Sequence, residues 1–245
     1  MSRRPPSVAV LGGGSWGTTV ASLAAQNTET TLWARSPEVA AEITEEHRNS
    51  RYLPDLSLTE SLRATADLAE AVTGADVLVM AVPSQSFRAV LTDAVEHVRP
   101  WIPVVSLVKG LEQGSRRRMT EIVAEVMPGH PAGVLAGPNI AAEVLRGYAA
   151  AATIAMPDQR SAEMLQELFR TKLFRVYTST DVIGVELAGA LRTCSPSRSA
   201  SVTGLRPGTT PGPWSSPAHC VSFPGSAWRW AGTRTPSPVS PAWVT

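Results

Sequence analysis

The sequence is poor in the residues that build metal centres and disulfide frameworks. Its two cysteines, Cys194 and Cys220, have no metal-ligand spacing and no framework pattern, so we expect no metal site. His47 and His130 have no partner at catalytic spacing, and we interpret both as ordinary loop residues. The net charge is only +1, so no general field attracts nucleic acid or a membrane surface.

Long apolar runs are also absent. No window has the length of apolar residues that a membrane-spanning helix needs, so we expect no membrane insertion. The opening Met-Ser-Arg-Arg-Pro-Pro is a short basic arm without an apolar core or cleavage site, unlike a signal peptide. The 43% apolar and 18% charged content is typical of a globular protein with a substantial core. Together these features predict a cytoplasmic protein.

A glycine-rich turn near the start is the strongest motif in the chain. Val8 to Leu11 reads as a buried strand, and the segment from Thr18 to Ala25 reads as a helix of small residues. Between them stand Gly12, Gly14 and Gly17, the G-x-G-x-x-G pattern of a dinucleotide site. The first glycine suits a tight turn, the second close approach of a pyrophosphate, and the third close packing of helix on strand. A glycine turn that binds nothing is the alternative.

The end of the second expected strand, Thr30 to Ala34, bears on the choice of cofactor. NAD sites usually place Asp or Glu there to bond the ribose 2′-hydroxyl. Here Arg35 follows the strand, and a guanidinium favours a 2′-phosphate. We therefore expect NADP(H), with NAD(H) as the second choice and a solvated surface arginine as the alternative interpretation.

Further elements alternate down the chain as strand and helix. Apolar runs and turn signals predict more strands at 62–66, 75–82, 103–108, 133–136, 150–156 and 174–177. Helices are expected at 37–47, 67–73, 87–95, 116–126, 140–145, 158–169 and 181–191. This rhythm predicts a doubly wound (Rossmann) α/β domain with a mostly parallel sheet. Ligands collect at the carboxyl ends of such strands, where the chain places the glycine turn, Pro83-Ser84, Lys109-Gly110 and Gly137-Pro138-Asn139.

Several motifs, in order along the chain, resemble the bacterial NAD(P)-dependent glycerol-3-phosphate dehydrogenases. The resemblance covers about Val8 to Leu191. It rests on the following segments: Leu11-Gly-Gly-Gly-Ser-Trp-Gly-Thr18, His47-Arg-Asn-Ser-Arg-Tyr-Leu-Pro54, Val82-Pro-Ser84, Ser106-Leu-Val-Lys-Gly-Leu-Glu112, Leu135-Ala-Gly-Pro-Asn139 and Asp181-Val-Ile-Gly-Val-Glu-Leu-Ala-Gly-Ala-Leu191.

The resemblance implies reversible hydride transfer between a nicotinamide and dihydroxyacetone phosphate, giving sn-glycerol 3-phosphate for glycerophospholipid synthesis. It implies that Ser15, Trp16, Arg35 and Tyr52 contact the cofactor and that Ala141 lies beside it. Lys109 is similar to the lysine that touches cofactor and substrate. From spacing alone, a merely solvated lysine at this strand end is equally acceptable. Gly137 and Asn139 resemble substrate contacts. A homodimer is the assembly that the intact family allows.

The resemblance breaks at Arg192, where the family has the lysine that transfers the proton. Arginine stays protonated, so Arg192 is no substitute for that lysine. No Asp, Glu or Lys follows Glu186, and residues 193–245 contain nine prolines and ten serines. We therefore divide the chain into a nucleotide-binding domain at 1–180, the start of a helical substrate domain at 181–192, and an irregular, disordered tail at 193–245.

The genetic code offers a reason for the break. If the codons of Arg-Thr-Cys are AGA-ACG-TGC, one added A upstream gives AAG-AAC-GTG, which encodes the family's Lys-Asn-Val. We therefore hypothesise that a single-base deletion, or a sequencing error of that kind, shifts the frame at Arg192. A native Pro/Ser-rich tail is the alternative that composition allows.

Two consequences follow for function. We expect the chain to bind NADPH but to turn over dihydroxyacetone phosphate poorly, and to expose an apolar docking face that favours aggregation. One alternative is a non-catalytic dinucleotide-binding remnant. Another is a different two-domain NADP-dependent reductase, of β-hydroxyacid or ketopantoate type, against which the motifs around Lys109 and Tyr52 argue.

Overall fold

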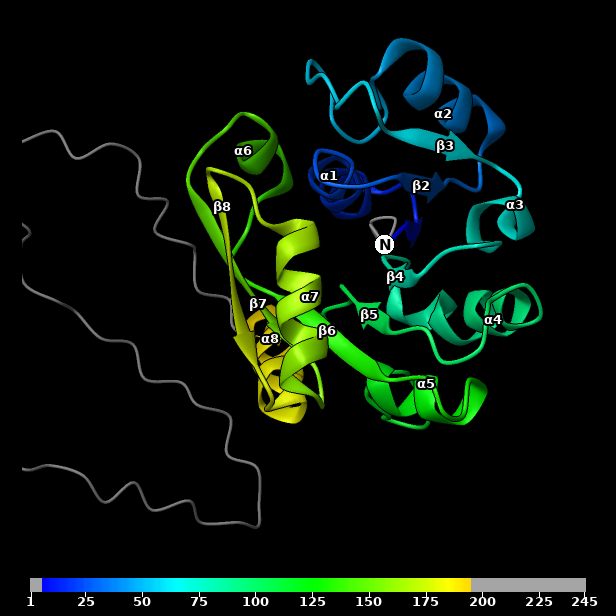
Figure 1. The fold of residues 1–245 in the computed structure, drawn as a ribbon, viewed down its shortest axis with the longest axis vertical. Coiled ribbons are helices and arrows are strands. Elements are labelled where there is room, and N and C mark those ends of the chain that lie inside the picture. Colours follow the sequence, from blue (N-terminus) through cyan, green and yellow to red (C-terminus); the bar gives the residue numbers. More distant parts are fainter. Residues whose placement is uncertain (1–5, 195–245) are drawn as a thin grey trace, which may run out of the picture. The chain divides into compact units, whose positions relative to one another are not determined.

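The structure, a computed structural model, describes residues 6–194, which form an eight-stranded sheet with helices on both faces (Figure 1). The strand order is β3-β2-β1-β4-β5-β6-β7-β8. All neighbouring strands are parallel except β6 and β7. The strands are β1 Val8–Leu11, β2 Thr30–Trp33, β3 Arg63–Thr65, β4 Val77–Met80, β5 Val104–Ser106, β6 Ala132–Ala136, β7 Ala150–Ala155 and β8 Phe174–Ser179. The predicted doubly wound, mostly parallel fold is confirmed.

Alternate residues of the central strands feed two separate cores. Val8 and Val10 of β1 pack into one apolar cluster, while Ala9 and Leu11 pack into the other. This alternation follows from the period of two in a strand, and all four residues are buried because helices cover both faces. The helices are α1 Ser15–Ala24, α2 Pro37–Ala41, α3 Leu68–Val72, α4 Ser84–Val95, α5 Met119–Val126, α6 Ala141–Leu145, α7 Gln159–Phe169 and α8 Val182–Cys194.

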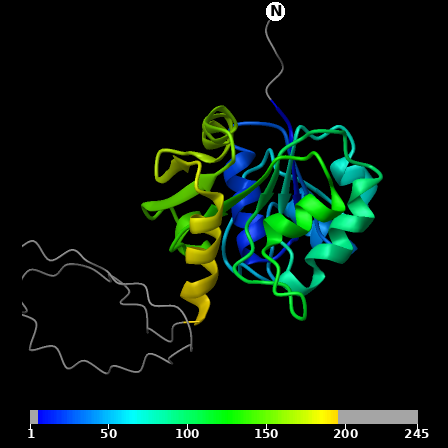
Figure 2. The same cartoon turned by 90° about the horizontal axis from the view of Figure 1, so that it is seen from below.

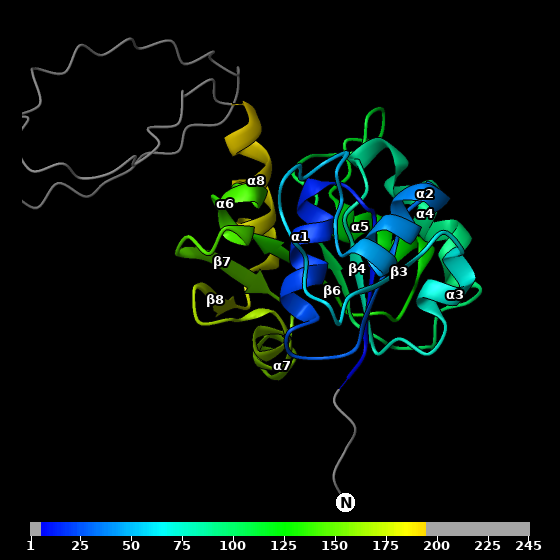
Figure 3. The ribbon, with the colours of Figure 1, turned by 90° about the horizontal axis from the view of Figure 1, so that it is seen from above.

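The two cores assign the helices to faces of the sheet. Residues of α1, α2, α6 and α7 share the first cluster, and residues of α3, α4 and α5 share the second. Figures 1 and 2 show α3, α4 and α5 together on one side. Helix α8 packs against β6 and β7, at the far end of the sheet from β3 (Figure 3). Within residues 6–194, no helix is long and apolar enough to cross a membrane.

Several expected helices have different bounds in the structure, and in two of them a left-handed residue is the reason. The helix expected at 37–47 is α2 followed by a short π-helix, η1 (Glu42–Glu46), and it ends before His47, which has a left-handed backbone with φ 53°. The helix expected at 116–126 begins only at Met119, because Arg116 is left-handed with φ 57°. Both corrections depend on positive φ values at non-glycine residues, which apolar periodicity does not reveal.

The C-terminal expectations are only partly covered by the described residues. Helix α8 continues to Cys194 and so passes through the expected break at Arg192. The irregular tail expected from residue 193 lies, from residue 195 onward, outside the described residues. The proposed boundary between residues 180 and 181 stays a prediction.

Candidate functional site

The glycine turn connects β1 to α1 in the geometry that its sequence predicts. Gly12 has φ 126°, and a Cβ there would lie 2.8 Å from the Ala81 carbonyl carbon. A Cβ on Gly17 would lie 2.0 Å from the Gly12 carbonyl oxygen, so only glycine lets α1 approach the turn this closely. A Cβ on Gly14, by contrast, would have no neighbouring atom within 4 Å. The turn is therefore tight on its protein side and open on the other.

The open side faces the N-terminus of α1. Gly14 occupies the N-cap position, so no side chain caps the helix, and its first turn holds no acidic residue. The first N–H groups of a helix have no partner within the helix and carry the positive end of its dipole. This end of α1 is consequently suited to an anion such as a pyrophosphate.

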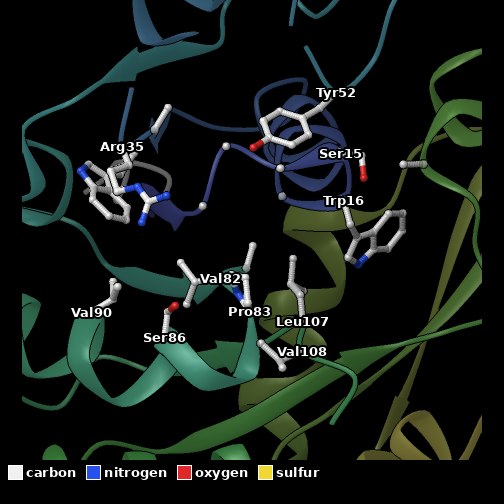
Figure 4. Close-up of a pocket in the computed structure, with 18 of the residues that line it drawn as sticks. Ser15, Trp16, Arg35, Tyr52, Val82, Pro83, Ser86, Val90, Leu107 and Val108 are labelled. Carbon is white, nitrogen blue, oxygen red and sulfur yellow. The ribbon is translucent and has the colours of Figure 1, made fainter. Parts of the chain in front are cut away.

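A cleft of about 700 Å³ lies at the carboxyl ends of β1, β2, β4 and β5. Figure 4 shows Arg35 and Trp16 at opposite ends of the view, with Tyr52 on the glycine-turn side and Pro83 and Leu107 across from it. Ten of the residues that the sequence predicts as a site line this cleft. They are Gly12, Gly14, Ser15, Trp16, Gly17, Arg35, Tyr52, Lys109, Asn139 and Ala141.

One cation at the cleft is not predicted from the sequence. Arg51 lines the cleft, and its guanidinium carbon lies 5.4 Å from the centre of the Tyr52 ring. An arginine over an aromatic face is attracted by the ring's negative face. With Arg35, it gives the cleft two guanidinium groups. The signal that the sequence offers for Arg51 is its place next to Tyr52 in the 47–54 motif.

The loop that carries Lys109 is attached to α4. The Arg88 guanidinium donates to both carboxylate oxygens of Glu112, at 2.7 and 3.0 Å. This ion pair, with help from the Ser115 hydroxyl, lowers the pKa of Glu112 from 4.5 to about 2. Gln85 adds a second attachment, since its amide oxygen accepts from the Gln113 N–H at 3.1 Å. These bonds fasten the far end of the loop after β5, and the exposed Lys109 side chain stands at the cleft.

The two predicted substrate contacts after β6 differ in position. Asn139 lines the cleft, and its amide nitrogen is buried without a hydrogen-bond partner among the described residues. Gly137 is not among the lining residues. A Cβ there would lie 2.6 Å from the Ala151 carbonyl oxygen and 2.6 Å from the Asn139 amide nitrogen. Gly137 therefore allows the close approach of β7 and Asn139, and its contact with substrate stays a prediction.

Helix α8, which contains position 192, is attached to the start of α5 by a buried carboxylate. Glu186 is 3% exposed. It accepts hydrogen bonds from the Thr120 N–H at 3.1 Å, the Thr120 hydroxyl at 2.6 Å and the Arg118 guanidinium at 3.1 Å. Arg192 lies in the same helix, but its side chain is outside the described part of the structure.

Comparison with known proteins agrees with this geometry. Residues 7–162 match the model of the NAD-dependent glycerol-3-phosphate dehydrogenase N-terminus. A glycerol-3-phosphate dehydrogenase [NAD(P)+] of Mycobacterium avium is 63% identical over 190 residues, and one of Mycobacterium tuberculosis is 60% identical over 192. These matches cover 77% and 78% of this chain but 56% of each relative. The chain thus spans little more than half the length of these relatives.

Comparison with solved structures likewise matches most of this chain to little more than half of the other chain. Glycerol-3-phosphate dehydrogenase from Coxiella burnetii is 34% identical with a TM-score of 0.70, covering 75% of this chain and 57% of that one. A ketopantoate reductase from Ralstonia eutropha is 19% identical with a TM-score of 0.54, covering 72% and 57%. The second likeness shows only a shared fold.

Proposed function

We propose that the cleft binds NAD(P)(H), because this chain belongs to the NAD-dependent glycerol-3-phosphate dehydrogenase family. The observation that supports this best is the open, uncapped N-terminus of α1 beside the glycine turn. Its relatives carry names that include NAD(P)+. In this proposal the pyrophosphate lies against Gly14, Ser15 and Trp16, where helix N–H groups face the cleft.

We further propose that NADP(H) is the preferred cofactor and that NAD(H) binds more weakly. Arg35 follows β2, the strand whose end meets the adenosine ribose in this fold. A guanidinium pairs well with a phosphate, and the second guanidinium of Arg51 adds positive charge to the same cleft. Tyr52 and Ala141 are proposed as further cofactor contacts, because both line the cleft.

The proposed reaction interconverts dihydroxyacetone phosphate and sn-glycerol 3-phosphate, the precursor of glycerophospholipids. A nicotinamide held in the cleft would supply or accept the hydride at the central carbon of the substrate. The Lys109 ammonium stabilises the negative charge that develops on the carbonyl oxygen, since it stands at the strand end on the cleft. Asn139, whose amide nitrogen has no partner among the described residues, is the proposed donor to a substrate oxygen.

A separate group must donate or remove the proton on that oxygen. At the position of that group, this chain departs from its family. Arg192 stands where the family has the proton-transferring lysine, and an arginine side chain does not release its proton in proteins. We therefore propose that this chain binds cofactor but catalyses the reaction weakly. A non-catalytic dinucleotide-binding protein is the second candidate, and Arg192 is the observation that favours it.

The experiment compares binding with turnover. NADPH and NADH are titrated against the 245-residue chain by fluorescence, and NADPH oxidation is then followed with dihydroxyacetone phosphate. The matched comparison is the product of the same gene with one A inserted ahead of codon 192. We expect NADPH binding in both proteins and a rate roughly 10²–10⁴-fold lower in the 245-residue chain. Equal rates would refute the impairment, and absence of dinucleotide binding would refute the site.

A further inference from the structure

A buried asparagine connects the segment 47–59 to the glycine turn. Asn49 is fully buried, with 0% exposure. Its side-chain amide donates to the Gly13 carbonyl oxygen at 3.0 Å and to the Thr18 hydroxyl at 2.9 Å. Its own amide oxygen has no partner among the described residues. Because an unpaired buried acceptor lowers stability, packing alone does not explain why an asparagine occupies this position.

The local fold places Asn49 at this point. The left-handed His47 ends η1, and the Glu42 carboxylate accepts from the Ser50 N–H at 2.9 Å. Further along, the Thr59 N–H donates to the Ser22 hydroxyl of α1 at 3.1 Å. The segment 47–59 is thus attached along α1, and Asn49 is its contact with the turn.

The bond to Gly13 determines how the turn presents its N–H groups. The Gly13 carbonyl and the Gly14 N–H belong to one planar trans peptide, so they point in opposite directions. Holding the carbonyl toward Asn49 therefore directs the Gly14 N–H away from Asn49. Gly14 and the first residues of α1 line the cleft, and Asn49 is not among the lining residues.

Asn49 also shapes the wall of the cleft through its backbone. Its carbonyl oxygen accepts from the Tyr52 N–H at 3.2 Å and from the Leu53 N–H at 2.8 Å. Leu53 is buried in the core, while Tyr52 and Arg51 line the cleft. Asn49 therefore joins the glycine turn to the turn that presents Tyr52.

We propose that Asn49 is a positioning residue that holds the glycine turn in the conformation that binds a dinucleotide pyrophosphate. This rests on the proposed cofactor function of the cleft. Asn49 itself does not line the cleft. Its effect on affinity passes through the Gly13–Gly14 peptide.

The test uses Asn49→Ala with Asn27→Ala as its control. Asn27 stands just past the other end of α1, and its amide likewise donates twice, to the carbonyl oxygens of Leu168 and Arg170, both at 2.9 Å. Both variants of the full chain are titrated with NADPH and with 2′-AMP, which has no pyrophosphate. We expect Asn49→Ala to raise the NADPH Kd roughly five- to tenfold and to leave the 2′-AMP Kd within about twofold. Asn27→Ala leaves both unchanged.

A second variant isolates the Gly13 contact. Asn49→Asp has the same size and keeps a contact with Thr18, whose hydroxyl then donates, but presents an oxygen to the Gly13 carbonyl. It is expected to weaken NADPH binding in the same selective way. If the parent chain binds neither NADPH nor NADH, both the cofactor site and this proposal fail. If the parent binds and both Asn49 variants keep its affinity, or lose NADPH and 2′-AMP equally, only the role of Asn49 is refuted.

Discussion

Removing the charge of Glu186 tests how α8 is held on the domain. In Glu186→Gln the side chain keeps its shape, and an amide oxygen still accepts from the Thr120 N–H. The second oxygen, which accepts from Arg118 and from the Thr120 hydroxyl, becomes an amide nitrogen. The variant therefore loses a charge-assisted hydrogen bond at a site where the Glu186 side chain is 2% exposed and Arg118 is 18% exposed.

The expected cost follows from that burial. Hydrogen bonds to charged groups contribute about 1.5–3 kcal/mol, and leaving one partner of a buried pair alone costs at least that much. We expect a loss of about 2–3 kcal/mol in the free energy of unfolding. In a domain of this size that corresponds to a fall in Tm of about 4–12 °C. The measurement is thermal unfolding followed by circular dichroism, with amide exchange read along α8.

The matched control is Glu121→Gln. Glu121 accepts from the same Arg118 guanidinium at 2.8 Å, but its side chain is 46% exposed. A solvent-exposed pair contributes only about 0–1 kcal/mol, so this variant should change Tm little. Equal shifts in the two variants, or unchanged amide exchange in α8 of Glu186→Gln, would contradict the view that Glu186 attaches α8 to α5.

Three further outcomes are expected. Arg35→Ala should raise the NADPH Kd about tenfold and leave the NADH Kd unchanged, because only the 2′-phosphate loses a partner; equal losses in fluorescence titration would oppose this. Gly17→Ala should abolish cofactor binding and lower Tm, since the new Cβ would lie 2.0 Å from the Gly12 oxygen. The pKa of Glu112 is lowered from 4.5 to about 2 by Arg88, so the folded state keeps this carboxylate ionised while the unfolded chain binds a proton. The stabilising contribution of this carboxylate is present above pH 4.5 and is lost as the pH falls toward about 2. In urea unfolding, the free energy of unfolding of Glu112→Gln should therefore fall less across that pH range than that of the parent chain.

Local sequence features could predict the cleft because parallel α/β topology brings strand ends together. The segments after β1, β2, β4 and β5 each carry a recognisable signal, and all four meet at one edge. The role of Asn49 could not be predicted in this way. Its partner Gly13 is 36 residues distant, and the left-handed His47 that directs it has no signature in hydrophobic periodicity. The contact between Arg118 and Glu186, which are 68 residues apart, could not be predicted for the same reason.

In the proposed reaction, cofactor binding and proton transfer depend on different parts of this chain. The residues proposed to hold the dinucleotide, from Gly12 to Ala141, lie within 7–162, where the family match is found, and their contacts are made among described residues. We propose that proton transfer depends on position 192, where the sequence has an arginine, a side chain that does not release its proton. Since Glu186 attaches the first half of α8 to α5 without touching the cleft, a change at position 192 need not disturb the glycine turn. Binding without efficient turnover is therefore the outcome that we propose for this chain.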